Sequence, residues 1–113
     1  MVPPMAFDPS LAERVTAVIG LRPDVEEKKM FGCLAWLLNG NFCLAVWKDS
    51  LVLRIDKAKR KPLFEDPFVQ PFDMKRTPMK GLAMVAAEGI EDEADLKRYV
   101  KLALDYVGTF PPK

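Results

Sequence analysis

Cys33 and Cys43 are the candidate nucleophiles of this 113-residue chain. The chain contains no histidine, so it lacks the commonest general base and the commonest transition-metal ligand. The acidic pair Asp92 and Glu93 stands where a helix is expected to begin, and acidic residues at that position serve to cap the helix. The sequence therefore predicts a protein that is not an enzyme and that has no metal site, no cofactor and no catalytic residue.

The basic segment 54–80 offers a different chemistry, contact with phosphate groups. Residues 48–80 hold nine Lys/Arg against five Asp/Glu, whereas the whole chain carries 17 against 16. Nucleic-acid-binding domains usually show an overall basic excess as well as a local one. A solvated helix face explains the same segment, so nucleic-acid binding is the alternative function and not the leading one. Its candidate residues are Lys57, Lys59, Arg60, Lys61, Lys75, Arg76 and Lys80.

The stretch 30–55 is expected to form the sheet on which the other elements pack. Two apolar runs, 33–38 and 41–47, flank the dipeptide Asn39-Gly40. Such a dipeptide is the strongest short-range signal for a hairpin, because a type I′ turn needs positive φ at both central positions. A second short turn at 48–50 leads into a third apolar run. The order predicts a three-stranded antiparallel meander.

Strict alternation from the first turn divides the side chains of this meander between two faces. The face expected beneath the helices holds Cys33, Ala35, Leu37, Phe42, Leu44, Val46, Leu51, Leu53 and Ile55. The opposite face is also apolar and carries both tryptophans, whereas a face open to water should be polar.

We therefore predict that the opposite face binds a second copy of the chain or another protein. The alternative is that the chain's own short helix and the 67–72 connection cover this face. The interface candidates are Leu34, Trp36, Leu38, Cys43, Ala45, Trp47, Val52 and Arg54.

Helices are expected near both ends of the chain. Asp8-Pro9 can open the first helix, with Ser10 as a rival cap, and Gly20 can end it. Glu91 or Asp92 can cap the last helix. The remaining segments add a strand at 25–31, a short helix at 56–61 and a last strand at 82–87.

The fold class predicted from this order is α+β, in two layers. An antiparallel sheet of about five strands carries both long helices on one face, in the order α-β-β-β-β-α-β-α. The chain is expected to be one domain, 1–113, with its core at about 8–108.

A cytoplasmic location is expected from three features of the chain. No secretory signal is visible, and the longest apolar stretch is broken by Gly32 and by the first turn, so it is no membrane-spanning helix. Cys33 and Cys43 fall on opposite faces, which makes a disulfide between them unfavourable. Cysteines outside disulfides fit a reducing compartment.

Several short stretches together resemble the TfoX (Sxy) N-terminal domain family. They are Lys28-Lys29-Met30-Phe31-Gly32, the turn at 39–42, the strand at 51–56, Pro71-Phe72 and the acidic start of the last helix at 91–93. The resemblance covers about residues 8–107, and departs from the family pattern at Cys33, where a second glycine is usual, and at Val52, where tyrosine is common.

The resemblance implies an α+β domain similar to secretion chaperones, of the kind found in regulators of competence and transcription. Those regulators carry a helical C-terminal domain, and this chain is expected to be a stand-alone member without it. A regulatory, non-enzymatic interaction domain, working as a homodimer or with a protein partner, is therefore the leading functional hypothesis.

Overall fold

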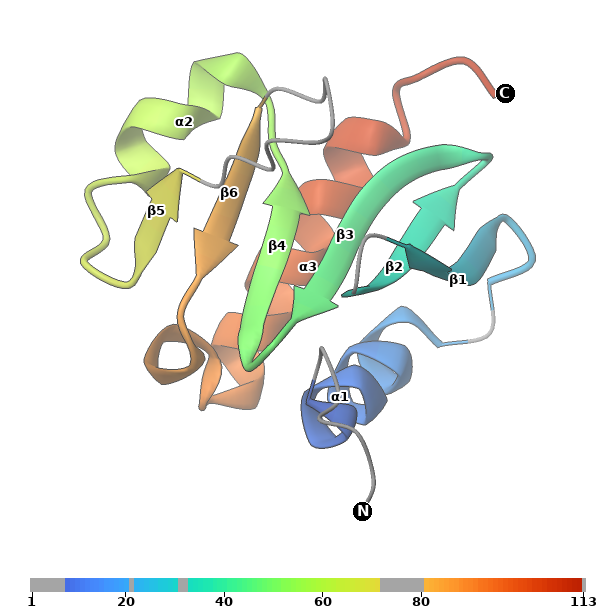
Figure 1. Ribbon diagram of the computed structural model, residues 1–113. Coiled ribbons are helices and arrows are strands. Elements are labelled where there is room, and N and C mark those ends of the chain that lie inside the picture. Colours follow the sequence, from blue (N-terminus) through green and yellow to red (C-terminus); the bar gives the residue numbers. More distant parts are fainter. Residues whose placement is uncertain (1–7, 21, 31–32, 72–80, 113) are drawn as a thin grey trace.

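The computed structural model describes residues 8–20, 22–30, 33–71 and 81–112. An antiparallel sheet of six strands forms one layer, and α1 and α3 pack on one of its faces (Figure 1). The elements are α1 (Pro9–Ile19), β1 (Val25–Met30), β2 (Cys33–Leu38), β3 (Asn41–Trp47), β4 (Ser50–Arg54), α2 (Lys57–Leu63), β5 (Val69–Pro71), β6 (Leu82–Val85), the 3-10 helix η1 (Ala87–Ile90) and α3 (Glu93–Val107). The predicted α+β class is confirmed, with six strands in place of about five.

Helix α1 begins and ends where its sequence predicts. The Asp8 carboxylate accepts a hydrogen bond from the backbone N–H of Ser10 at 2.9 Å, so Asp8 is the cap and Ser10 is not. Pro9 occupies the first helical position, where its missing N–H is not needed. Gly20 ends the helix with φ of 72°, a conformation that glycine adopts without strain.

Helix α3 packs its apolar stripe against the centre of the sheet. Asp92 caps it by accepting from the backbone N–H of Ala94 at 2.9 Å. All five residues of this stripe are buried: Leu96, Tyr99, Val100, Ala103 and Val107. The Tyr99 hydroxyl lies at the end of a buried ring and donates to the Asp66 carboxylate at 2.9 Å, which ties α3 to the segment before β5.

The strands run in the order β1-β2-β3-β4-β6-β5, so β6 lies between β4 and β5. The hairpin from β2 to β3 turns at Asn39 and Gly40, with φ of 51° and 84°, as a type I′ turn requires. The second turn, at Lys48 and Asp49, also has a positive φ, 54° at Lys48. Strands β1 and β5 form the two borders of the sheet (Figure 1).

A β-bulge overturns the predicted assignment of faces. Next to the turn, Leu37 pairs with Phe42 as expected, but Trp36 then pairs with Leu44 and not with Cys43. The extra residue in β3 breaks the alternation, as bulges do. Cys43 and Leu44 therefore both belong to the core beneath the helices, while Phe42 belongs to the opposite face.

The bulge reverses the predicted faces of β2 and of the turn end of β3. Residues predicted on the interface face but found in the core beneath the helices are Leu34, Trp36, Leu38 and Cys43. Residues predicted beneath the helices but found on the opposite face are Cys33, Ala35, Leu37 and Phe42. The other predicted positions, on β4 and the far half of β3, are confirmed for Leu44, Val46, Leu51, Leu53, Ile55, Ala45, Trp47 and Val52.

The short helix α2 runs one residue past Pro62, where the sequence favours either a break or a second turn over 63–65. The structure has the turn, since the N–H groups of Glu65 and Asp66 donate to the carbonyls of Pro62 and Leu63. Pro62 has no N–H to donate to the carbonyl of Ala58 four residues earlier, and the helix ends one residue later, at Leu63. Leu63 and Phe64 pack against the core beneath the helices and do not cover the opposite face. The predicted tail at 1–6 and the predicted loop or strand at 73–79 lie outside the described residues.

Candidate functional site

The outer cluster is the apolar group on the sheet face opposite α1 and α3. Its buried members are Cys33, Ala35, Phe42, Ala45, Val52 and Leu82, and its partly buried members are Leu37, Trp47 and Met84. Strands β2, β3, β4 and β6 each contribute to it. The described residues of α1 and α3 pack on the other side of these strands (Figure 1). The face of an antiparallel sheet that lies away from its helices is usually polar, so the apolar composition of the face opposite α1 and α3 is the unusual feature of the molecule.

Only part of the predicted interface lies in the outer cluster. Ala45, Trp47 and Val52 do so, whereas Trp36 is 2% exposed beneath the helices. A surface made of both tryptophans therefore does not exist. Sequence reasoning missed Leu82 and Met84, although their alternation with Ala83 and Val85 in the last apolar run was visible.

Arg54 is held by its own chain at the end of β4. Its Nη1 donates to the carbonyl of Phe42 at 3.4 Å, and its guanidinium lies 4.6 Å from the centroid of the Phe110 ring. Arg54, predicted as an interface residue, is thus held by a backbone carbonyl and an aromatic ring of its own chain. At the other end of the sheet, the Lys48 ammonium lies 4.5 Å from the Trp47 ring centroid.

The two thiols are poor nucleophiles in the folded chain. Burial raises the pKa of the Cys43 thiol from 9.0 to about 12, although the nearby charges of Arg22 and Arg54 oppose the shift. Burial also raises the pKa of Cys33. As predicted, the two side chains lie on opposite faces of the sheet and form no disulfide. Their faces are the reverse of the prediction, since Cys43 lies beneath the helices and Cys33 lies on the opposite face.

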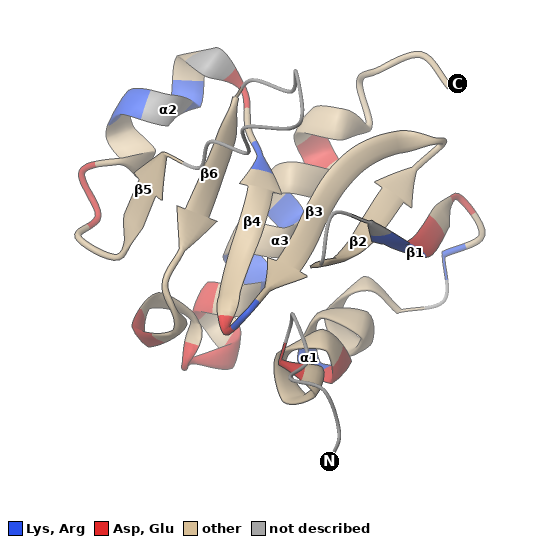
Figure 2. Ribbon diagram, in the orientation of Figure 1, with Lys and Arg blue, Asp and Glu red and all other residues tan. Residues whose placement is uncertain are grey.

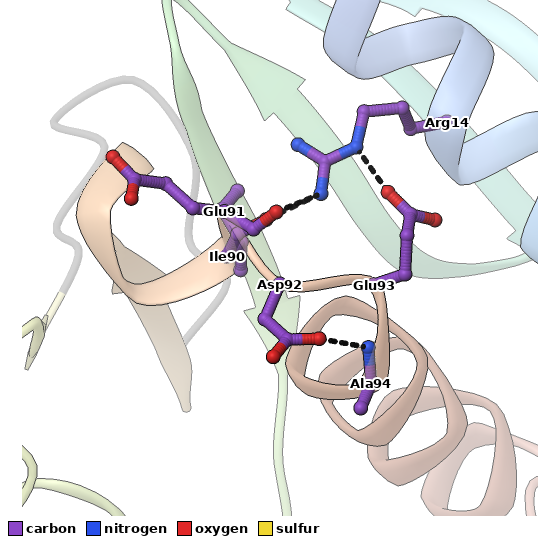
Figure 3. Close-up of polar contacts among 6 residues, drawn as sticks. All are labelled: Arg14, Ile90, Glu91, Asp92, Glu93 and Ala94. Carbon is purple, nitrogen blue, oxygen red and sulfur yellow. Dashed lines mark hydrogen bonds and ion pairs between the residues drawn. The ribbon is translucent and has the colours of Figure 1, made fainter.

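The acidic pair at the start of α3 serves the fold. Asp92 caps the helix, and the Glu93 carboxylate accepts a hydrogen bond from Nε of Arg14 at 2.6 Å (Figure 3). The same arginine donates from Nη2 to the carbonyl of Ile90 at 2.5 Å. Arg14 of α1 thereby links the first helix to the junction between η1 and α3. Among the described residues no group of His, Cys, Asp or Glu is arranged to hold a metal ion.

Replacing Arg14 by glutamine is expected to lower the free energy of unfolding by about 1–2 kcal/mol, because the carbonyl of Ile90 then loses the donor of a partly buried hydrogen bond. The ion pair to Glu93 adds little, since it is open to solvent. Urea denaturation measures the change. Lys97→Gln is the control, because Lys97 is exposed on α3, and it should change stability by less than about 0.5 kcal/mol. Equal losses in both variants would contradict the assigned role of Arg14.

The basic candidates are only partly described. Lys59 and Lys61 are exposed on α2, where Figure 2 shows a basic stretch, and Lys57 and Arg60 belong to the same helix. Lys75, Arg76 and Lys80 lie outside the described residues. The described part of this segment thus presents two exposed lysines on α2, and nucleic-acid binding stays a prediction.

The motif residues lie at opposite borders of the sheet. Lys28 and Lys29 are exposed on β1, Met30 ends that strand, and Pro71 is exposed at the end of β5. Phe31, Gly32 and Phe72 lie outside the described residues.

Comparison with known proteins identifies one family. A family model described as the TfoX N-terminal domain matches residues 18–107. The match spans every strand of the sheet, η1 and α3, so it includes the whole outer cluster. No curated protein matches the chain, and no solved structure matches it. Within the described residues, no helix is long and apolar enough to cross a membrane.

Proposed function

The chain belongs to the TfoX N-terminal domain family, and from this premise we propose that it is a regulatory domain that acts by binding other proteins and not by catalysis. The chain has no histidine, and both of its thiols are buried and have raised pKa values. Thiols in that state are inert as nucleophiles at neutral pH. These observations support an interaction domain over an enzyme. The proposal includes a cytoplasmic location, which the absence of a disulfide between the two cysteines supports.

The observation that carries the proposal is the outer cluster. Six of its residues are buried, and Leu37, Trp47 and Met84 form a partly exposed apolar margin. A tryptophan at such a margin offers a large contact area at low entropic cost, and tryptophan is enriched among the residues that dominate binding energy. We therefore place the contact with a protein partner at this margin, with Trp47 as its anchor.

Substitution of Trp47 by alanine tests this proposal. Tagged wild-type protein and the Trp47→Ala variant are used to capture proteins from a lysate, and each captured protein is then measured with purified components by calorimetry. Binding to the partner should weaken by tenfold or more in the variant, since an aromatic residue that dominates an interface is worth about 2 kcal/mol or more.

The control is Lys97→Ala, because Lys97 is exposed on α3, on the other side of the sheet. This variant should bind the partner as the wild type does. If no captured protein distinguishes Trp47→Ala from wild type, the margin of the outer cluster is not the binding surface.

A further inference from the structure

We propose that two copies of the chain pair through their β1 strands, in antiparallel orientation, to form one continuous sheet. The inference rests on the proposed function, because it names a second copy as one partner of the interaction domain. It is carried by the edge position of β1, by the direction of its backbone groups and by its order of charges.

Strand β1 borders the sheet, and no described strand lies beyond it. The backbone N–H of Asn39 donates to the carbonyl of Asp24 at 2.8 Å, which shows that Asp24 points its backbone groups toward β2. Backbone groups alternate in direction along an antiparallel pair. Glu26 and Lys28 therefore also point theirs toward β2, while Glu27 and Lys29 point theirs outward, to the open edge.

The charges of β1 are arranged in two blocks. The strand reads Val-Glu-Glu-Lys-Lys-Met, so two negative residues precede two positive ones. A charged edge strand discourages pairing with unrelated strands. In antiparallel self-pairing, however, the acidic half of one copy meets the basic half of the other, whereas a parallel arrangement places like charges together. The same residues that repel other strands thus favour a second copy.

Geometry selects one register of this pairing. Opposite residues of an antiparallel pair lie on the same face of the sheet. The two-fold axis must therefore pass between one residue and the same residue of the second copy, so that this residue stands opposite itself. With the axis at Lys28, each Glu27 stands opposite Lys29 of the second copy, and their outward backbone groups pair.

The neighbouring register, with the axis at Glu27, places Val25 in the new ladder. That position is unfavourable, because the N–H of Val25 already donates to the carbonyl of Arg22 at 3.2 Å. The register centred on Lys28 avoids Val25. It sets two lysines face to face at the axis, but Glu26 of each copy lies diagonally from Lys28 of the other and offsets part of their repulsion.

Because the two-fold axis is perpendicular to the sheet, each face of one copy continues into the same face of the second copy. Both outer clusters then lie on the same side of the joined sheet. Leu37 of β2, which pairs with Glu26 of β1, is among the cluster residues closest to the junction. A partner bound at the outer clusters can therefore contact both copies at once.

Charge reversal tests the pairing by sedimentation velocity over a range of protein concentrations. Wild type should show a reversible monomer–dimer equilibrium that weakens with added salt. Glu27→Lys and Lys29→Glu should each raise the dimer dissociation constant by about tenfold or more, because each change turns both opposite-charge pairs into like-charge pairs. An equimolar mixture of the two variants should restore dimers, because each lysine then faces a glutamate.

Lys28→Glu is the matched control, since it makes the same change of charge at the neighbouring residue. In the proposed register it replaces one like-charged pair by another and turns the two diagonal attractions to Glu26 into repulsions. Because diagonal neighbours lie farther apart than opposite ones, it should raise the dissociation constant by about threefold, less than Lys29→Glu does. A wild-type protein that stays monomeric at all concentrations would overturn the proposal, and so would a dimer that Glu27→Lys and Lys29→Glu leave unchanged. A larger effect of Lys28→Glu than of Lys29→Glu would overturn the register.

Failure here is distinct from failure of the proposed function. Trp47 lies on β3, which is two strands away from the β1 edge. Trp47→Ala should therefore leave self-association intact while it removes partner binding. Circular dichroism of each variant confirms that the exposed charge changes leave the fold in place.

Discussion

Replacement of Trp36 by alanine is expected to lower the free energy of unfolding by about 3–5 kcal/mol, the usual range for removal of a buried tryptophan. Trp36 is 2% exposed and lies in the core beneath α1 and α3. Its loss leaves a cavity that close-packed neighbours fill only in part. Trp47→Ala should lower stability by only about 1–2 kcal/mol, because Trp47 is already partly exposed in the folded chain.

Urea unfolding followed by circular dichroism measures both changes in the same way. The difference between the two tryptophans is the consequence of the bulge, because strict alternation would place both on one face. Equal and small losses would indicate that Trp36 lies on the outer face, and the described register of β2 and β3 would then be wrong. Intrinsic fluorescence gives an independent check, since quenching by iodide should act on Trp47 and spare Trp36.

Alkylation of Cys43 at pH 8 is expected to be about a thousandfold slower in the folded chain than in the unfolded chain. Burial raises the pKa of this thiol from 9.0 to about 12, and only the thiolate reacts. A rise of about three pH units lowers the thiolate fraction by about that factor. Cys43 is also 1% exposed, so the reagent has little access to it.

Iodoacetamide labelling followed by mass spectrometry of the peptides measures the rate at each cysteine. The same labelling in guanidinium chloride supplies the unfolded reference. Cys33, whose pKa is also raised by burial, should be protected as well. Labelling of native Cys43 at the unfolded rate would show that it is not in the core, which would again contradict the bulge.

The raised pKa of Cys43 also predicts how the stability of the fold changes with pH. Because the folded thiol has the higher pKa, the unfolded chain loses this proton first as the pH rises. The contribution of Cys43 to stability is complete below pH 9 and declines as the pH rises from about 9 toward about 12. A Cys43→Ala variant should lose less stability than wild type over that range.

The sequence by itself determined the elements whose signals are local. Asp8-Pro9 and Gly20 bound α1, Asp92 caps α3, and Asn39-Gly40 forms the first hairpin turn, each through hydrogen bonds or φ angles within a few residues. These signals act before any long-range contact forms. The short stretches at 28–32, 39–42, 51–56, 71–72 and 91–93, taken together with their spacing, also indicated the family that the comparison confirms.

Only the tertiary structure decided which side chains share a face. The bulge opposite Trp36 and Leu37 is a single extra residue in β3, and no residue type in that run distinguishes it from regular strand. Because side chains alternate with a period of two, this one residue reverses the faces of β2 and of the turn end of β3 relative to the rest of the sheet.

Strand order also depends on the tertiary structure, because it requires pairing between strands that are far apart in the sequence. Strand β5 is three residues long and, within the described part of the chain, pairs with β6 alone, and β6 reaches β4 from far along the chain. Pairing over such distances is stabilised by packing of the complete sheet on α3, and a local pattern does not encode it. The outer cluster and the open edge of β1 follow from this order, so the candidate surfaces became visible only when the strands were placed side by side.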